Sequence, residues 1–335
     1  MEKLLLTTFL YPPLSNSSFS IYSSILDQFA FRSTGSTTSA LISILQAVTD
    51  LLENYPYVHV ISCDFSKAFD TVRHSSLMSK VAGVPISDSV YNWLVNFLTG
   101  RSHFTKFQFK SSSSAPISAG VVQGSAIGPA AFIICASDLH PLTPGNQQRK
   151  YAADIYLIVP SVNTHSIPSE LNHISSWASD NNLRLNPSKC SEIIFKKPRS
   201  RTPDPPPSCG IERVSSLKIL GVTFQSNLSM TEHTNNLMAK AGQSLYALKI
   251  LKSSGLADRL LASVCNATLL NSITYASPAW CGFASSEDKI RLQSIFNKAF
   301  RLGLCSPTSP HNFSSICDRS DSRLFQKICI SYCTP

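Results

Sequence analysis

The sequence lacks several patterns that would each define a class of protein. Its ten cysteines form no Cys-x-x-Cys pair, and no histidine–cysteine group has zinc-ligand spacing, apart from a loose pair, Cys329 and Cys333. No run approaches the roughly 18 apolar residues that a membrane-spanning helix needs. Glu2 beside Lys3, with no small-residue cleavage site after them, argues against a secretory signal. We therefore expect no structural zinc, no membrane contact and a reducing intracellular compartment (nucleus or cytoplasm) rather than secretion.

Acidic residues are also scarce. The 335 residues include 29 Lys and Arg against 20 Asp and Glu, which gives a net charge of +9 at pH 7. This excess favours a polyanionic partner, nucleic acid before an anionic membrane, although a merely basic protein would show the same balance. With 43% hydrophobic residues, the chain can bury the core of one large domain or of two to three smaller ones.

Strands and helices are mixed without regular alternation, and no internal repeat occurs. Apolar spacing predicts helices from residue 36 or 37 to about 55, and over 68–83 and 88–100. Strands are expected over 57–63, 103–110, 155–159, 190–197 and 217–224. A Pro-rich basic loop covers 198–210, and a helical pattern then runs to about residue 305. The mixture predicts an α+β fold with an antiparallel sheet, helices on one face, and a mostly helical C-terminal region.

Two acids stand at the ends of predicted strands. Asp64 follows "YVHVISC", and Asp154 precedes "IYLIVP". A single acid in such a place is usually a solvated turn or a helix N-cap. Two such carboxylates brought together repel each other, and a divalent cation keeps both ionised while phosphate oxygens and water complete its ligands. The pair therefore indicates a cation site that handles phosphate groups.

Five segments occur in the order and spacing of successive reverse transcriptase motifs: "CDFSKAFDTVRH", "GVVQGSAIGPAAF", "YAAD", "NNLRLNPSKCSEIIFKK" and "LKILGVTF". The chain most resembles the non-LTR, LINE-type retrotransposons of the jockey kind. The flanking segments "DQFAFRSTGSTTSALI" and "ITYASPAWCGF" extend the resemblance over nearly the whole chain. It implies a right-hand polymerase fold and RNA-directed DNA synthesis with Mg²⁺ or Mn²⁺. The implied partners are an RNA template, a DNA primer and deoxynucleoside triphosphates.

The resemblance also implies a division into domains. Partial fingers would cover residues 1–57, the palm 58–225 with the loop 198–210, a helical thumb-like region 226–305, and a C-terminal tail 306–335. The family's earlier basic fingers motif and any endonuclease domain are absent from the sequence. We therefore expect an N-terminally truncated copy of the element.

Metal-binding roles follow from the resemblance residue by residue. Asp64, the backbone carbonyl of Phe65, and Asp154 would bind the metal. The ring of Phe69 would clash with a 2′-hydroxyl and so select deoxynucleotides; from the residues alone, a core aromatic is the alternative interpretation. The remaining matches in this motif, Asp70 and His74, are expected to be helix-start and surface residues rather than catalysts.

Further positions match the motifs that hold the substrates. Gln123 and Gly124 would lie against the incoming nucleotide and the template base, where glycine lets the backbone approach closely. Arg32 would lie near the triphosphate, although a solvated surface arginine is the alternative. Lys189 lies where some polymerases place a proton donor for pyrophosphate.

Basic residues and one hairpin would hold the nucleic acid. Leu220 and Gly221 match the hairpin that grips the primer end. Basic residues in "KKPRSR" and in the C-terminal helices could track phosphates, unless they are only solvated on helix faces: Lys240, Lys249, Lys252, Lys298 and Arg301.

The catalytic turn departs from the family. The family has Tyr-Ala-Asp-Asp, whereas this chain has Tyr151, Ala152, Ala153 and Asp154, so alanine stands at the position of the principal metal ligand. Strand alternation argues that Asp154 does not take over that position. Loss of a central electrostatic group costs on the order of 10²–10³ in rate in other enzymes. We expect an impaired polymerase; the alternatives are a non-catalytic nucleic-acid-binding relic or co-opted copy, and a reading frame that is not expressed.

Overall fold

The computed structural model describes the chain except residues 33–34, 123, 198–199, 209, 307–311 and 334–335, and it describes only the backbone of 328–333. The chain forms two compact units. The first comprises 1–194 and 202–214, and the second comprises 195–201 and 215–335. Each unit is described separately below. Among the helices that the structure describes, none combines the length and apolar composition needed to span a bilayer.

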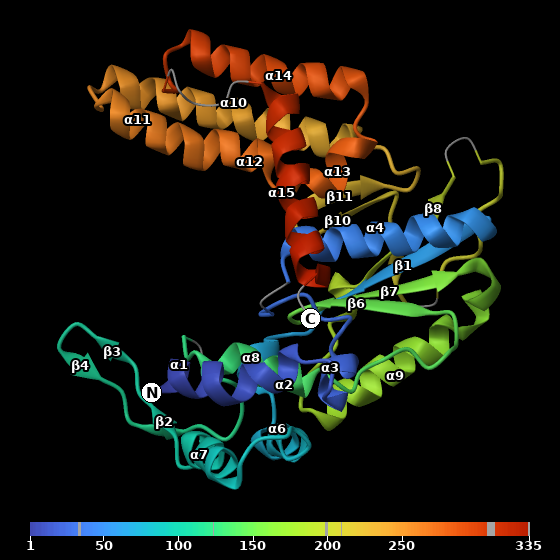
Figure 1. The fold of residues 1–335 in the computed structure, drawn as a ribbon, viewed down its shortest axis with the longest axis vertical. Helices are drawn as coiled ribbons and strands as arrows, with labels where there is room; N and C mark the ends of the chain where they lie inside the picture. Colours follow the sequence, from blue (N-terminus) through green and yellow to red (C-terminus); the bar gives the residue numbers. More distant parts are fainter. Residues whose placement is uncertain (33–34, 123, 198–199, 209, 307–311, 334–335) are drawn as a thin grey trace. The chain divides into compact units, whose positions relative to one another are not determined.

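A five-stranded sheet forms the centre of the first unit (Figure 1). Its strand order is β6-β7-β1-β8-β9. Strand β1 pairs antiparallel with β7, β7 pairs antiparallel with β6, and β8 pairs parallel with β9. The strands are β6 (Gln147–Tyr151), β7 (Asp154–Pro160), β1 (Tyr57–Cys63), β8 (Ser191–Lys196) and β9 (Glu212–Arg213).

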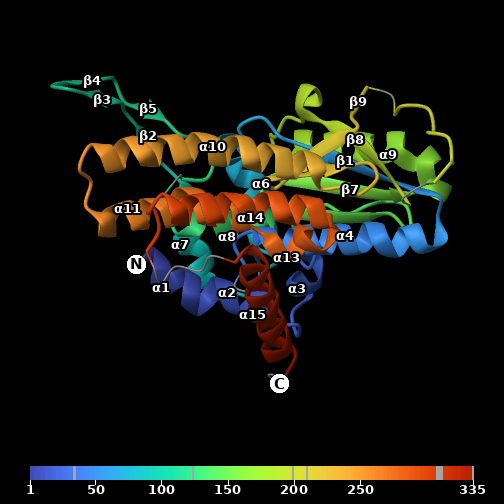
Figure 2. The same cartoon turned by 90° about the horizontal axis from the view of Figure 1, so that it is seen from above.

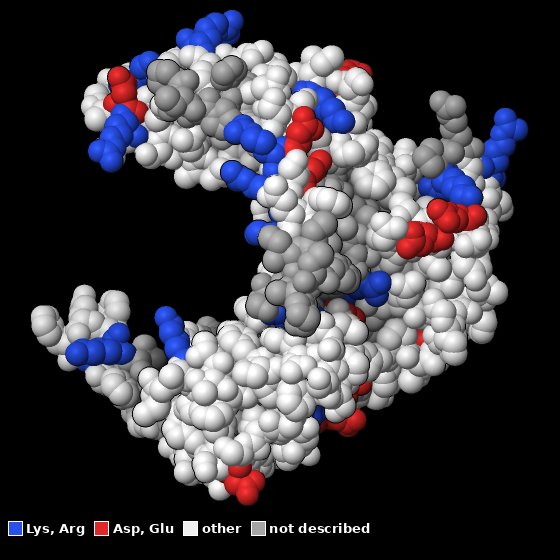
Figure 3. Space-filling model, in the orientation of Figure 1, with Lys and Arg blue, Asp and Glu red and all other residues white. Residues whose placement is uncertain are grey.

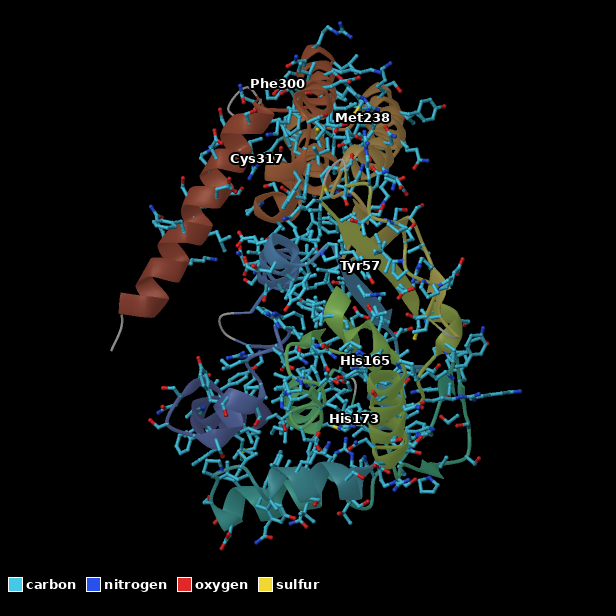
Figure 4. All side chains as sticks on the ribbon, turned by 90° about the vertical axis from the view of Figure 1, so that its right-hand side faces the viewer. Tyr57, His165, His173, Met238, Phe300 and Cys317 are labelled. Carbon is cyan, nitrogen blue, oxygen red and sulfur yellow. The ribbon has the colours of Figure 1, made fainter. Side chains whose placement is uncertain are left out.

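Helices cover both faces of this sheet. Helix α4 (Thr37–Asn54) packs against β1, β6 and β7 through a buried apolar stripe that includes Leu41 and Ile44. On the other face, α8 (Ile127–Cys135) and α9 (Ile167–Asp180) share one core cluster with β1 and β7. Figure 4 marks β1 by Tyr57 and α9 by His173. The predicted α+β class is confirmed, and α4 adds a layer to the single helical face that was expected.

Short helices complete the first unit. The predicted helix over 36–55 is confirmed as α4, and Ser36 caps it by accepting a hydrogen bond from the Ser39 N–H at 3.0 Å. The remaining helices are α1 (Glu2–Leu5), the π-helix η1 (Leu6–Leu10), α2 (Tyr11–Ser15), α3 (Ser20–Ser24), α5 (Ala68–Thr71), α6 (His74–Val81), α7 (Asp88–Leu98), and the 3₁₀ helices η2 (Ser161–Ser166) and η3 (Pro187–Lys189).

The prediction of one helix over 68–83 is wrong, because the chain breaks between α5 and α6. The carbonyls of Phe69 and Val72 accept hydrogen bonds from the N–H groups of Val121 and Gly120, both at 2.7 Å. These carbonyls therefore serve the segment before α8 instead of continuing a helical ladder. His74 adds a third link, its Nε2 lying 2.7 Å from the Gly120 carbonyl. The half-buried His74 thus fixes the loop that leads into α8, rather than lying free on the surface as expected.

Four two-residue strands form a hairpin between α7 and α8 that extends away from the helices of its own unit (Figure 2). They are β2 (Ser102–His103), β3 (Lys106–Phe107), β4 (Lys110–Ser111) and β5 (Ala115–Pro116). The single strand predicted over 103–110 is therefore two short strands and a turn. All residues from 102 to 116 are exposed.

The second unit is mostly helical, as the sequence predicts. Its core packs Trp280 and Phe296 around Phe313, with ring centroids 6.2 and 6.0 Å from that of Phe313. The stretch 217–224, expected to be one strand, forms the hairpin β10 (Ser216–Ile219) and β11 (Val222–Gln225). The helices are α10 (Thr231–Ser253), α11 (Asp258–Cys265), the π-helix η4 (Asn266–Leu270), α12 (Asn271–Thr274), α13 (Ser277–Trp280), the 3₁₀ helix η5 (Cys281–Phe283), α14 (Ser286–Arg301) and α15 (Phe313–Cys333).

Candidate polymerase active site

The register of β1 and β7 brings the two strand-end acids together. Cys63 lies opposite Ile155, so the next pair along the two strands is Asp64 and Asp154. Residues directly opposite in an antiparallel pair point to the same face of the sheet. The two carboxylates, 90 residues apart in sequence, therefore lie side by side where two inner strands of the sheet end, as the motifs predict.

Asp64 is held by a basic side chain and by backbone contacts. The Lys189 ammonium lies 2.9 Å from Asp64 Oδ2. The Asp64 carbonyl accepts a hydrogen bond from the Asn186 N–H, and the Arg184 carbonyl accepts one from the Ser66 N–H, both at 2.9 Å. These two bonds flank the isolated bridge between Phe65 and Leu185 and do not use the Phe65 carbonyl, whose predicted contact with a metal stays a prediction.

The pKa of Asp154 depends on the charges around it. Burial raises the pKa of the Asp154 carboxyl, and the negative charge of Asp64 raises it further. The positive charge of Lys189 partly offsets both effects. A cation placed between the two carboxylates would therefore relieve an existing repulsion.

Ala153 lies in the turn between β6 and β7 and not in either strand. Tyr151 pairs with Asp154, which leaves Ala152 and Ala153 as a two-residue loop. Ala152 has a φ of +54°, a conformation that costs energy for a residue with a Cβ atom. Strand alternation begins only at Asp154 and therefore does not fix the direction of residue 153. That Asp154 does not take over the position of the missing ligand stays a prediction. Ala153 is partly buried and packs against the core cluster.

One buried side chain, which sequence reasoning missed, clamps this turn. Gln28 accepts a hydrogen bond from the Ala152 N–H at 2.9 Å and donates one from Nε2 to the Ala152 carbonyl at 3.3 Å. Its flanking backbone pairs with β6, since the Phe29 N–H donates to Lys150 and the Lys150 N–H donates to Asp27. The only signal in the sequence is a glutamine within the apolar stretch "QFAF".

Phe69 belongs to an aromatic cluster beside the site's first strand. Its ring centroid lies 4.5 Å from that of Phe132 and 6.2 Å from that of Phe31. Phe69 is only partly buried, so part of the ring stays accessible. Its predicted contact with a deoxyribose stays a prediction.

Three further residues, Gln123, Gly124 and Arg32, were predicted to contact the nucleotide. Gln123 lies outside the described residues. Gly124 has a φ of +83°, and a Cβ atom there would meet no atom within 4 Å, so the position is open. The Arg32 guanidinium donates from Nη1 to the carbonyls of Ile25 and Gln28 at 2.8 and 3.2 Å. Together with Tyr22, whose ring lies 5.5 Å from the guanidinium, these bonds orient Arg32 within its own segment, and its predicted phosphate contact stays a prediction.

The predicted primer grip lies in the second unit. Leu220 and Gly221 form the turn between β10 and β11, with φ values of +44° and +93°. The Tyr275 hydroxyl donates to the Leu220 carbonyl at 3.1 Å, and a Cβ atom at Gly221 would lie 3.2 Å from the Tyr275 ring. Tyr275 therefore supports the turn, a role that the sequence did not indicate.

The basic residues predicted to track phosphates are exposed on α10 and α14. Lys252 already has two hydrogen-bond partners within the protein. Its ammonium donates to the carbonyls of Leu302 and Gly303 at the end of α14, at 2.8 and 3.2 Å. This contact is a helix C-terminal cap. The other four stay predictions: Lys240, Lys249, Lys298 and Arg301.

The donor set at the sheet edge fits one divalent cation. Mg²⁺ takes one or two carboxylates and completes its shell with water and phosphate oxygens. Asp64, Asp154 and the Phe65 carbonyl are such donors, and the negative charge of Asp64, which raises the pKa of Asp154, would be offset by a bound cation. Within the described part of the chain, no group of three or more histidine, cysteine and acidic residues could hold a metal.

Known proteins share both the sequence pattern and the fold. The sequence matches the family described as reverse transcriptase (RNA-dependent DNA polymerase) over residues 20–224. It is 27% identical over 241 residues to the RNA-directed DNA polymerase from the mobile element jockey of Drosophila melanogaster, covering 68% of this chain and 26% of that protein. It is 25% identical over 289 residues to the probable RNA-directed DNA polymerase from transposon X-element of the same species, covering 82% of this chain and 31% of that protein.

Solved structures of telomerase resemble the fold. Telomerase from Candida tropicalis, in complex with a fragment of telomeric RNA, aligns with a TM-score of 0.52 at 12% identity, over 98% of this chain and 53% of that chain. The apo form of the same protein aligns with a TM-score of 0.50, over 98% of this chain and 60% of that chain. The shared fold is that of a right-hand polymerase.

The fold thus defines the class of this protein as a right-hand polymerase. The chain belongs to the reverse transcriptase (RNA-dependent DNA polymerase) family, and its curated relatives are non-LTR retrotransposon polymerases. It spans about a quarter to a third of their length.

Proposed function

We propose that this chain is a template-directed polymerase domain that extends a DNA primer on an RNA template, and that Ala153 lowers its rate. The observation that carries the proposal is the meeting of Asp64 and Asp154 at one sheet edge. Asp64, Asp154 and the Phe65 carbonyl would hold the divalent metal. When bound, that ion would lower the pKa of the primer 3′-hydroxyl and neutralise phosphate charge.

Other residues of the site would position the substrates. The partly buried ring of Phe69 would lie under the sugar, and the open backbone at Gly124 would let a base or triphosphate approach closely. The Arg32 guanidinium, which its own segment orients, would contact phosphate oxygens. Lys189, whose side chain is 64% exposed and ion-paired with Asp64, would donate a proton to the leaving pyrophosphate.

We further propose that residues 1–57 are part of the fingers, 58–225 the palm, 226–305 the thumb and 306–335 a tail. The β10–β11 hairpin, at the end of the proposed palm, groups with the helices of the second unit. That grouping suits a primer grip, because the hairpin turn is supported by Tyr275 of the helical region.

The proposal is tested by primer extension with an RNA template, a labelled DNA primer and Mg²⁺. The Ala153→Asp variant should add nucleotides in the order that the template dictates, because the missing shared ligand is restored. Asp64→Asn in the same background should abolish that addition, since it removes the other principal ligand. Template-independent addition, or addition that persists without Asp64, would refute the proposal.

The second candidate function is nucleic-acid binding without catalysis. It is favoured by Ala153 together with the Lys189–Asp64 ion pair, in which an ammonium supplies part of the charge that a metal would provide. This candidate predicts salt-sensitive RNA binding by both the unaltered chain and Ala153→Asp, with no extension by either. The same assay therefore separates the two functions.

A further inference from the structure

The hairpin formed by residues 102–116 exposes three aromatic rings within six residues. Phe104 is 61% exposed, Phe107 is 73% exposed, and Phe109, in the turn, is fully exposed. Gln108 beside it has a φ of +52°, which forms the tight turn that presents Phe109 at the tip. The ring positions therefore follow from backbone geometry and not from packing against a core.

Exposed rings of this kind need an explanation. A phenylalanine can bury 150–250 Å² of surface, and a cluster of exposed apolar side chains marks an interaction site. An isolated two-stranded hairpin is only marginally stable in water, and apolar rings exposed to water do not stabilise it. A ligand with flat apolar faces would cover them.

The charge of the hairpin identifies the chemistry of that ligand. No Asp or Glu occurs between Asp88 and Asp138, whereas Arg101, Lys106 and Lys110 lie on or at the base of the hairpin. In the view of Figure 3 the hairpin carries blue Lys and Arg atoms and no red ones. A purely positive surface favours a polyanion over an acidic or a neutral protein surface.

One ring and one ammonium lie on the same face of the hairpin. Phe107 pairs directly with Lys110 across the hairpin, so the ring and the ammonium lie on one face, and Lys106 pairs with Ser111 on the other. A ring beside an ammonium matches the base and phosphate of one nucleotide. Duplex nucleic acid hides its base faces, whereas a single strand offers them for stacking.

We propose that the 102–116 hairpin binds single-stranded nucleic acid, namely the unpaired part of the RNA template, by stacking bases on Phe107 and Phe109. Lys110 on the Phe107 face and Lys106 on the opposite face would contact phosphates on the two sides of the tip. This inference rests on the proposed function for the identity of the strand as a template. The stacking surface itself is defined by the hairpin alone.

The test measures binding of a fluorescent 12-residue oligouridylate to the full chain by anisotropy, in EDTA so that no catalysis occurs. Phe107→Ala and Phe109→Ala should each weaken binding on the order of tenfold, since one base–aromatic stack contributes about that factor. Lys106→Gln combined with Lys110→Gln should reduce the slope of log K against log salt by roughly 1.4, about 0.7 for each lost phosphate contact on a single strand.

The matched control is Phe325→Ala, which removes an equally exposed ring, 68% exposed, on α15. It should leave oligouridylate binding unchanged. All four hairpin positions are exposed, so their substitution does not create a core cavity. Equal binding by the hairpin variants and the unaltered chain would overturn the proposal. A change only in the sedimentation of the free chain, or only in binding to anionic vesicles, would overturn it in favour of a protein or a membrane partner.

The failure of this inference can be told apart from failure of the proposed function. If Ala153→Asp extends primers but the phenylalanine variants bind template normally, the polymerase assignment stands and the hairpin is not its template surface. If no variant extends primers but oligouridylate binding depends on the hairpin, the surface stands and the catalytic assignment falls.

Discussion

At the scale of single residues, the site is governed by two carboxylates and one ammonium. Asp154 is half-buried and faces Asp64, and both effects raise its pKa, while Lys189 lowers it. Lys189 also binds Asp64 directly at 2.9 Å. The structure therefore keeps a repulsive pair in place at the expense of stability, which is typical of functional sites.

Replacing Asp154 should stabilise the fold. Because its folded pKa is raised above the unfolded value, ionised Asp154 destabilises the native state, and Asp154→Asn should raise Tm at pH 7. The difference in Tm between Asp154→Asn and the unaltered chain should shrink as pH falls through the folded pKa of Asp154, because the native carboxyl is then neutral like the amide. Thermal unfolding followed by circular dichroism at pH 7 and pH 4 measures both effects. The control is Asp50→Asn, at an exposed acid on α4; a lower Tm for Asp154→Asn at pH 7 would contradict this view.

At the scale of elements, the β6–β7 turn depends on the segment that precedes α4. Gln28 satisfies both the N–H and the carbonyl of Ala152, whose φ is positive. A strained turn persists only where its surroundings hold it. The side-chain amide of Gln28 holds the turn through its two hydrogen bonds, and it is a positioning residue that does not contact a substrate.

Gln28→Ala should loosen the turn and cost about 1–3 kcal/mol, because it leaves buried polar groups without a partner. Hydrogen exchange should accelerate at residues 151–154 more than elsewhere in the sheet. Gln28→Glu should restore part of the protection, since a carboxylate still accepts from the Ala152 N–H. Gln46→Ala, at an exposed glutamine on α4, is the matched control. Uniform acceleration across the sheet would indicate general destabilisation instead of a local clamp.

A buried ionic network joins β1, β8 and β9 at residues other than the Asp64–Asp154 pair. Glu192 lies 2.7 Å from His59 Nδ1, 2.5 Å from the Ser208 hydroxyl and 2.6 Å from Arg213 Nη2. Burial alone would raise the pKa of Glu192, yet the hydrogen bonds from His59, Ser208 and Arg213 lower it to about 2. These bonds therefore outweigh the desolvation of a fully buried carboxylate.

This network predicts an acid-sensitive contribution to stability. Because the folded pKa is depressed, Glu192 stabilises the fold above its unfolded pKa near 4.5 and loses that contribution as pH falls towards about 2. Glu192→Gln should remove on the order of 3 kcal/mol at pH 7 and flatten the loss between about pH 5 and pH 2. Urea unfolding across that range measures it. Glu212→Gln, at an exposed acid in adjacent β9, should change stability by less than about 0.5 kcal/mol; equal effects of the two variants would refute the network's role.

The same elements show what the sequence can and cannot predict. The positions of Asp64 and Asp154 were predictable because one follows and the other precedes an apolar strand within an ordered set of motifs. Gln28 was not, because its bonds go to backbone groups 124 residues away and leave no periodic pattern. The break between α5 and α6 was missed for the same reason: local spacing favours one helix, and tertiary hydrogen bonds from Gly120 and Val121 override it.

At the scale of the whole molecule, the basic charge and the polymerase fold point to the same partner. The net charge of +9 favours a polyanion, and the family to which the chain belongs copies RNA into DNA. The 102–116 hairpin and the carboxylate pair lie in one compact unit, so a single unit would carry both the proposed surface for a strand and the proposed reaction site. The fold tolerates alanine at 153, because a small side chain fits the partly buried turn.

The most direct test of the central claim is the ratio of single-nucleotide incorporation rates between Ala153→Asp and the unaltered chain, on one primer, one RNA template and saturating Mg²⁺. If the sheet edge is a polymerase site weakened by the loss of one metal ligand, the ratio should be on the order of 10²–10³. A ratio near one, with both proteins extending the primer rapidly, would show that Ala153 does not limit the chemistry. A ratio near one with no incorporation by either protein would show that the paired acids do not form a working polymerase site.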